Sequence, residues 1–175
     1  RFVNLCQCYF RGFQAPVGLQ LDFSCWCMQE LRSEELVFEV EAALGIAAKL
    51  HIPLVPKFCL TLPITAAVQI ARHEKCDGLC VSNAVPWGQL PELIDWKGLF
   101  GSHESPLARF GGGALSGKPL FPLMLDWVIR ARIAGIDKPI NACGGIFSKK
   151  NARAALTVAD SISLGSVELL RPWRV

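Results

Sequence analysis

Two glycine-containing turns follow segments with the composition of β-strands. The segment 139–143 runs into Gly144-Gly145, and the segment 161–164 runs into Gly165-Ser166. Glycine lets backbone amides approach an anion closely, and a helix that begins after such a turn adds unpaired N–H groups. A single turn of this kind is often only a tight turn. Two consecutive strand–turn–helix units favour a phosphate-binding site.

Polar side chains stand at three further strand ends, where parallel α/β folds bind their ligands. Cys25 follows the first expected strand, Lys57 ends the second, and Ser82 and Asn83 end the third. A thiol there is a candidate nucleophile or proton acceptor if its pKa is lowered. A buried lysine needs a partner because an unpaired ammonium is costly to bury. The structural alternatives are that Lys57 reaches solvent and that Asn83 only forms a turn.

Short β-rich segments alternate with longer segments of helical period along the chain. Helices are predicted to begin at Ser33, at Pro63, near Leu120 and after Ser148. In the first helix, Leu36, Val40, Leu44 and Ala47 form the expected buried stripe, and the last helix places Ala152, Ala155 and Leu156 inside. The predicted strands are 17–23, 53–58, 78–83, 139–143 and 161–164.

Repeated alternation of strand and helix indicates parallel strands joined by right-handed crossovers. We interpret the strands as apolar on both faces. Because a complete barrel has about 250 residues, we predict an α/β fold that is a partial TIM (β/α)8 barrel. Residues 1–175 would be a single domain with about five C-terminal parallel strands. The alternative is a complete, open, doubly wound sheet. Segment 84–119, rich in Gly, Pro and Trp, is predicted to be a long irregular active-site loop.

Composition argues against several classes of protein. The net charge of +3 and the absence of like-charge blocks give no support to nucleic-acid binding. No apolar stretch is long enough for a membrane span, and we expect a cytoplasmic protein. The eight cysteines are expected to be reduced, mostly buried thiols, with a structural zinc or iron–sulfur site as the alternative. Hydrolase and zinc-protease motifs are not present in the sequence.

Four motifs together resemble the dihydroorotate dehydrogenase family. The most specific is GGALSGKP at 112–119, which is similar to the flavin-contacting GGLSGKP of that family. The others are VSNA at 81–84, PINACGG at 139–145 and LGS at 164–166, in the order that the family has them. The resemblance covers nearly the whole chain, from about residue 18 to residue 174.

This resemblance implies FMN at the mouth of the barrel and oxidation of dihydroorotate to orotate in pyrimidine synthesis. It implies that Cys25 is the base that removes a ring proton, and a thiol there is typical of the soluble class. Asn83 would hydrogen-bond the pyrimidine, with Ala84, Asp22 and Cys27 at neighbouring substrate positions. Lys57 would stabilise negative charge on the flavin as hydride arrives. The implied FMN contacts are Lys57, Ser82, Gly117, Gly144, Gly145, Gly165 and Ser166.

The sequence departs from the family around the base. The family has Asn on either side, whereas this chain has Asp22 and Cys27, and Trp26 replaces a Pro. The first barrel strands would lie outside the chain, so a missing N-terminal barrel half is an expected partner, and a homo-oligomer is left open. Alternative functions are another flavin barrel acting on a pyrimidine, or a non-catalytic fragment or pseudoenzyme.

Overall fold

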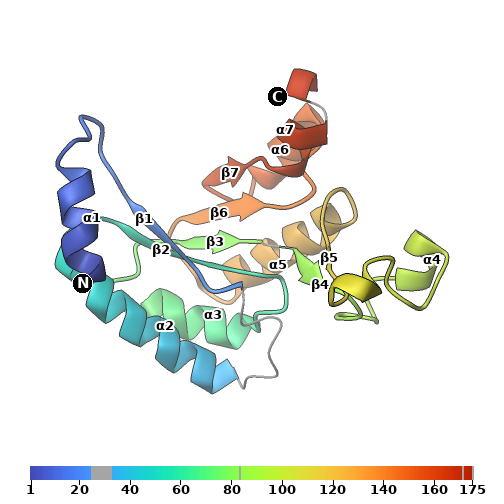
Figure 1. Cartoon of the computed structure of the whole chain (residues 1–175), viewed down its shortest axis with the longest axis horizontal. Helices are drawn as coiled ribbons and strands as arrows, with labels where there is room; N and C mark the ends of the chain where they lie inside the picture. Colours follow the sequence, from blue (N-terminus) through green and yellow to red (C-terminus); the bar gives the residue numbers. More distant parts are fainter. Residues whose placement is uncertain (25–32, 83, 171, 175) are drawn as a thin grey trace.

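A parallel β-sheet forms the centre of the computed structural model, which describes residues 1–24, 33–82, 84–170 and 172–174. Within these residues the sheet has five strands in the order β1-β2-β3-β6-β7 (Figure 1). Each strand falls inside a segment that the sequence predicts. The bounds are β1 (Leu19–Asp22), β2 (Leu54–Phe58), β3 (Leu79–Val81), β6 (Ile140–Cys143) and β7 (Ser161–Ser163).

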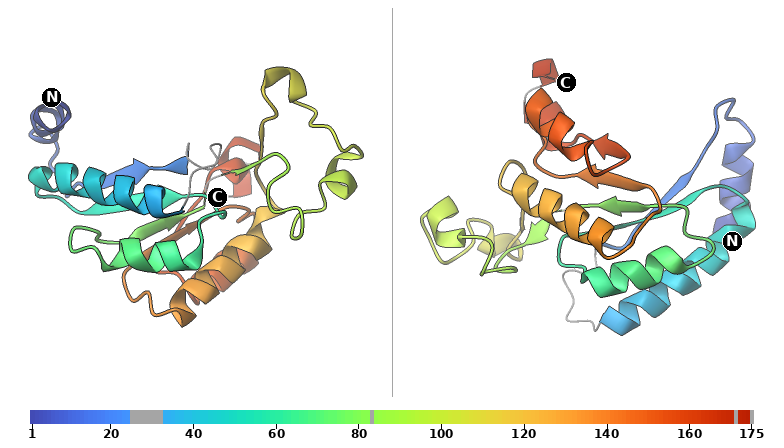
Figure 2. Two further views of the ribbon diagram at one scale, coloured as in Figure 1. Left: turned by 90° about the horizontal axis from the view of Figure 1, so that it is seen from below. Right: turned by 180° about the vertical axis from the view of Figure 1, so that it is seen from behind.

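The strand order decides between the two predicted topologies. The described strands of this sheet neighbour one another in the order in which they follow along the chain, and all pairs are parallel. A doubly wound sheet reverses its strand order at a switch point, so that alternative is excluded. One face of the sheet is covered by helices α2 (Ser33–Ala47), α3 (Ile64–Arg72) and α5 (Leu120–Ile133) (Figure 2). This is the arrangement of part of a (β/α)8 barrel, and the predicted fold class is confirmed.

The covering helices pack apolar side chains onto that face. Val40, Leu44 and Ala47 are buried as predicted, whereas Val37 is more deeply buried than Leu36. Leu156 is exposed, against expectation, because its helix has already ended at Ala155. The helices are α2 (Ser33–Ala47), α3 (Ile64–Arg72), α5 (Leu120–Ile133) and α6 (Lys149–Ala155).

Two side chains tie α5 to the rest of the fold. The buried indole of Trp127 donates a hydrogen bond to the Leu62 carbonyl at 2.9 Å. The Arg132 guanidinium donates to three backbone carbonyls just before the starts of β6 and β7 and forms an ion pair with Asp160. Asp160 in turn accepts from the Ile140 amide at 2.7 Å. These contacts fix the helix against the strands that end at the two glycine turns.

The segment 84–119 has more regular structure than predicted. It contains the antiparallel pair β4 (Val85–Pro86) and β5 (Ala114–Leu115), with α4 (Trp96–Phe100) and η3 (Ala108–Phe110) between them. Figure 1 shows it extending as an arm beyond the sheet. The side chains of Trp87, Trp96 and Phe100 pack together, with ring centroids as close as 4.7 Å. An aromatic cluster therefore gives this arm a small core of its own.

The remaining elements lie at the two ends of the chain and after α2. They are α1 (Phe2–Phe10), η2 (Ala48–Leu50), α7 (Ser166–Leu170) and η4 (Pro172–Arg174). Among the described residues, no helix combines the length and the apolar character that a membrane crossing requires.

The two faces of the sheet differ in polarity. The helix-covered face carries buried apolar side chains such as Leu54, Phe58 and Ile140. The opposite face carries polar side chains at the alternating positions, among them Asp22 and Ser163. The prediction of strands apolar on both faces is therefore wrong, because β1 (LQLD) and β7 (SIS) alternate in polarity. Barrel interiors are usually filled by branched apolar residues, so a polar interior face needs an explanation.

Candidate functional site

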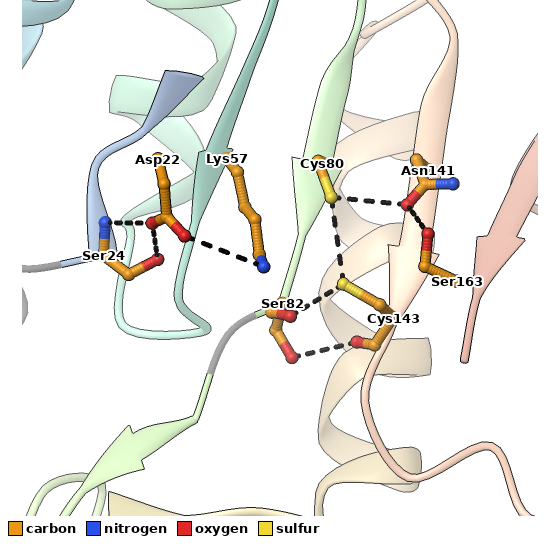
Figure 3. Close-up of polar contacts among 8 residues, drawn as sticks. All are labelled: Asp22, Ser24, Lys57, Cys80, Ser82, Asn141, Cys143 and Ser163. Atoms are coloured by element: carbon orange, nitrogen blue, oxygen red, sulfur yellow. Dashed lines mark hydrogen bonds and ion pairs between the residues drawn. The ribbon is translucent and has the colours of Figure 1, made fainter. Parts of the chain in front are cut away.

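A row of five polar or thiol residues crosses the open face of the sheet, one from each strand. In the strand register, Asp22 pairs with Lys57, Lys57 with Cys80, Cys80 with Asn141, and Asn141 with Ser161. Residues paired in this way point to the same face of a sheet. We call Asp22, Lys57, Cys80, Asn141 and Ser161 the polar row; Figure 3 draws its first four members.

The members of the polar row contact one another. Lys57 Nζ lies 3.7 Å from Asp22 Oδ2, and Asp22 also accepts from the Ser24 amide at 2.8 Å. Asn141 Nδ2 donates to the Ser161 hydroxyl at 2.8 Å, and Asn141 Oδ1 accepts from Cys80 Sγ at 3.3 Å. The polar groups therefore hold one another in place on the face opposite to helices α2, α3 and α5.

A pocket of about 210 Å³ lies at the carboxyl end of this face. It brings together both glycine turns and the ends of β2 and β3, although these segments are far apart in sequence. Its polar and glycine lining consists of Lys57, Ser82, Ser116, Cys143, Gly144, Gly145, Ser163, Gly165 and Ser166, and its other walls are Ala84, Leu120, Ile146, Phe147, Leu164 and Val167.

The glycines of the two turns have different roles beside the pocket. A Cβ on Gly145 would lie 2.5 Å from the Phe121 amide nitrogen and 2.8 Å from the Gly117 carbonyl oxygen. Gly145 also has φ of +71°, where side chains are disfavoured. Around Gly165, in contrast, no described atom lies within 4 Å of the position that a Cβ would take. Gly145 thus permits the start of α5 to pack closely, and Gly165 leaves open space beside the pocket.

The GGALSGKP motif contributes Ser116 to the lining of the pocket. The Ser116 and Ser166 hydroxyls are 2.9 Å apart, so they join this motif to the second glycine turn. Gly117 does not line the pocket, but its carbonyl lies against Gly145. The start of α6 does not contribute, since its N-terminus is capped by Ser148, which accepts from the Asn151 amide at 3.1 Å.

Two buried cysteines lie side by side at the pocket: Cys143 forms part of its wall, and Cys80 lies behind Cys143. Cys80 Sγ and Cys143 Sγ are 3.8 Å apart, and Cys143 Sγ is 2.7 Å from the Ser82 carbonyl oxygen. The hydrogen bond between the thiols raises the pKa of Cys80, and burial raises it further. The same hydrogen bond lowers the pKa of Cys143, assisted by the positive charge of Lys57. Cys143 is therefore the more readily ionised member of the pair.

Most cysteines in the described part of the chain follow the prediction of reduced thiols. Among the described residues, the free thiols are Cys6, Cys8, Cys76, Cys80 and Cys143. Cys59 is part of a disulfide bond, so the prediction is wrong at that position. No group of three or more His, Cys, Asp or Glu side chains in the described part of the chain could hold a metal ion.

Most of the predicted site residues gather at one place. Lys57, Ser82 and Ala84 line the pocket with the four residues of the glycine turns, and Asp22 reaches it through its ion pair with Lys57. Three further predicted residues, Cys25, Cys27 and Asn83, lie outside the described residues.

Sequence reasoning named Asp22 and Lys57 but missed the other members of the polar row, Cys80, Asn141 and Ser161, and it also missed Ser116 and Cys143. Cys143 directly precedes the first glycine turn, and the alternation in INAC and SIS indicates a polar strand face. These signals were present in the sequence, but they are weak in strands of three or four residues.

Comparisons with family models and with curated proteins give no match. Among solved structures, the chain is similar to a DHODH (dihydroorotate dehydrogenase) from Eimeria tenella, crystallised in complex with ferulenol. The TM-score is 0.61 at 18% sequence identity, and the match covers 88% of this chain and 46% of that chain. The chain therefore spans about half the length of that protein, and it has a DHODH-like fold.

Proposed function

We propose that the chain forms the flavin-binding part of an FMN-dependent oxidoreductase of the dihydroorotate dehydrogenase type. One observation carries this proposal: Lys57, Ser82 and both glycine turns converge on a single pocket at the carboxyl edge of the sheet. The DHODH-like fold supports it, since ligands of parallel α/β barrels bind at that edge.

The pocket has the groups that FMN requires. A phosphate needs backbone amides and hydroxyls with space beside them, which the Gly165-Ser166 turn and Ser116 offer. The flavin ring needs a polar partner along its edge, and the Lys57 side chain is 20% exposed at the pocket wall. Because Gly144 lacks a side chain, the Ser82 hydroxyl can lie close to the first glycine turn: a Cβ on Gly144 would be 2.7 Å from Ser82 Oγ.

When bound, FMN would supply the hydride-accepting chemistry. Lys57 would hold positive charge beside the ring, and its ion pair with Asp22 would fix the direction of its amino group. The Ser82 hydroxyl donates to the Cys143 carbonyl at 3.0 Å. This bond uses the hydroxyl proton, so the Ser82 Oγ would act as an acceptor toward the pocket. The roles of Cys25 as proton-abstracting base, and of Asn83, Ala84 and Cys27 as substrate contacts, rest on the family resemblance.

The proposed function also requires further strands that close a barrel around this pocket. The open face carries the polar row, so closing strands would enclose Asp22, Asn141 and Ser161 inside the barrel. We propose that a further barrel half supplies these strands. The arm formed by residues 84–119 would then stand at the mouth of the barrel, with Ala84 and Ser116, which lie at or near its two ends, in the pocket wall.

A specific observation favours a second candidate. Asp22 places a carboxylate 3.7 Å from the Lys57 amino group, and an anionic substrate would bring a second carboxylate into the same region. Like charges at close range oppose each other. A flavin barrel that acts on a neutral pyrimidine is therefore the alternative. Turnover of uracil without turnover of dihydroorotate by the flavin-loaded protein would favour it, and the reverse would favour the first proposal.

FMN binding by the purified chain tests the proposal. Flavin fluorescence should be quenched saturably by the chain, and Gly165→Val should weaken binding by at least about tenfold, roughly 1.4 kcal/mol. This variant fills open space beside the pocket without displacing a neighbour. Gly12→Val is the matched control, because Gly12 lies in the turn after α1, outside the pocket lining. Equal affinity of the two variants, or no binding by the unmodified chain, would contradict the proposal.

A further inference from the structure

The Cys80 and Cys143 pair has no part in the proposed flavin chemistry. Both side chains are buried, at 1% and 9% exposure, and they sit on adjacent strands. Cys143 forms part of the pocket wall, and Cys80 lies behind it with the two sulfurs 3.8 Å apart. Two thiols placed together in this way can react with an oxidant or bind a thiophilic ion.

The strand geometry decides between oxidation of the two thiols to a disulfide and binding of a metal ion. Cys80 is in register with Asn141, so Cys143 lies two residues further along the neighbouring strand. With strands about 4.8 Å apart and a rise of about 3.3 Å per residue, the two Cα atoms are roughly 8 Å apart. A disulfide needs Cα atoms within about 7 Å. A direct S–S bond would therefore require the strands to shift.

A bridging atom fits the same two sulfurs without such a shift. A metal ion about 2.3 Å from each sulfur would span their 3.8 Å separation at an S–metal–S angle of about 111°, close to the tetrahedral angle. Oxygen acceptors lie beside both sulfurs: the Ser82 carbonyl is 2.7 Å from Cys143 Sγ, and Asn141 Oδ1 is 3.3 Å from Cys80 Sγ. The pocket offers access for water to complete the coordination.

We propose that Cys80 and Cys143 bind one thiophilic divalent metal ion of the zinc–cadmium class at the base of the pocket. Binding replaces both thiol protons, so each ion taken up releases two protons and forms two metal–thiolate bonds. Cys143 is the more accessible first ligand, because it forms part of the pocket wall and Cys80 lies behind it. Affinity should rise with pH because the metal and the protons compete for the same sulfurs.

Cadmium titration of the full chain tests the site. Cys6, which is half-buried, and Cys8, which is exposed, are first replaced by serine, and the cadmium–thiolate absorption band is followed in the ultraviolet. Loss of even an outer partner of a metal ligand weakens binding about 10–100-fold. Cys80→Ser and Cys143→Ser should each weaken cadmium binding at least that much. Cys76→Ser is the matched control, because Cys76 is equally buried but donates only to the Gly78 carbonyl.

X-ray absorption spectroscopy of the cadmium-loaded Cys6→Ser/Cys8→Ser chain gives a readout that does not depend on the folding of any Cys80 or Cys143 variant. Two sulfur ligands with the remainder oxygen support the site, whereas none or four contradict it. Equal cadmium affinity in Cys80→Ser, Cys143→Ser and Cys76→Ser would also overturn the proposal. Neither measurement uses flavin, so the proposal stands or falls separately from the proposed function.

Discussion

Replacing Gly145 by alanine should destabilise the fold more than its small size suggests. The new Cβ would meet backbone atoms, 2.5 Å from the Phe121 nitrogen and 2.8 Å from the Gly117 oxygen, and backbone cannot move aside as a side-chain tip can. Overpacking of this kind costs about 1–3 kcal/mol. The positive φ of Gly145 adds about 1–2 kcal/mol for any residue with a Cβ. We expect Gly145→Ala to lower the free energy of unfolding by about 2–5 kcal/mol.

Gly135→Ala separates the two contributions. Gly135 has φ of +90°, but no described atom lies within 4 Å of its Cβ position, so only the backbone penalty of about 1–2 kcal/mol applies. Urea unfolding of both variants, followed by circular dichroism, measures the difference, which should be about 1–3 kcal/mol. Two variants that agree within about 0.5 kcal/mol would show that Gly145 is not packed against the start of α5 as described.

Two further predictions concern the contacts that position α5. The Ile140 amide, together with Arg132, lowers the pKa of Asp160 below its ordinary value of 3.8 in the folded chain. The ionised carboxylate therefore contributes its full stabilisation above pH 3.8. This contribution is lost as the pH falls through the lower pKa that Asp160 has in the folded chain. Acid titrations should show a shallower loss of stability for Asp160→Asn than for the unmodified chain; identical slopes would contradict the contact. Trp127→Phe leaves the Leu62 carbonyl without its donor and opens space in the core, and we expect urea unfolding to show a loss of about 2–4 kcal/mol. A loss below about 1 kcal/mol would mean that the indole hydrogen bond contributes little.

Element order and fold class could be predicted from the sequence because helix and strand signals agree along most of the chain. Ser148 caps α6 as its side chain and position predict, and Gly135 ends α5 with a positive φ. The polarity of the sheet could not be predicted as readily. Each strand has only three to five residues, so one or two polar side chains such as Asn141 look like isolated exceptions until the register aligns them.

The candidate site was predictable where a residue has a local reason for its identity. Gly144 and Gly145 follow a strand directly, and positive φ values of 114° and 71° require glycine there. The contact between Ser116 and Ser166, which are 50 positions apart, has no such local signal. The same holds for the Cys80 and Cys143 pair, since only the parallel pairing of β3 and β6 brings the two sulfurs together.

Backbone amide NMR of the 19.2 kDa chain, titrated with FMN and separately with riboflavin, tests most directly whether the two glycine turns hold a flavin phosphate. We expect FMN to shift the amide resonances of Gly144, Gly145, Gly165 and Ser166, which line the pocket, and riboflavin to shift them far less. Unchanged resonances at both turns on FMN addition, or shifts confined to the separate pocket near His51 and Glu74, would contradict a flavin site at the carboxyl edge of the sheet.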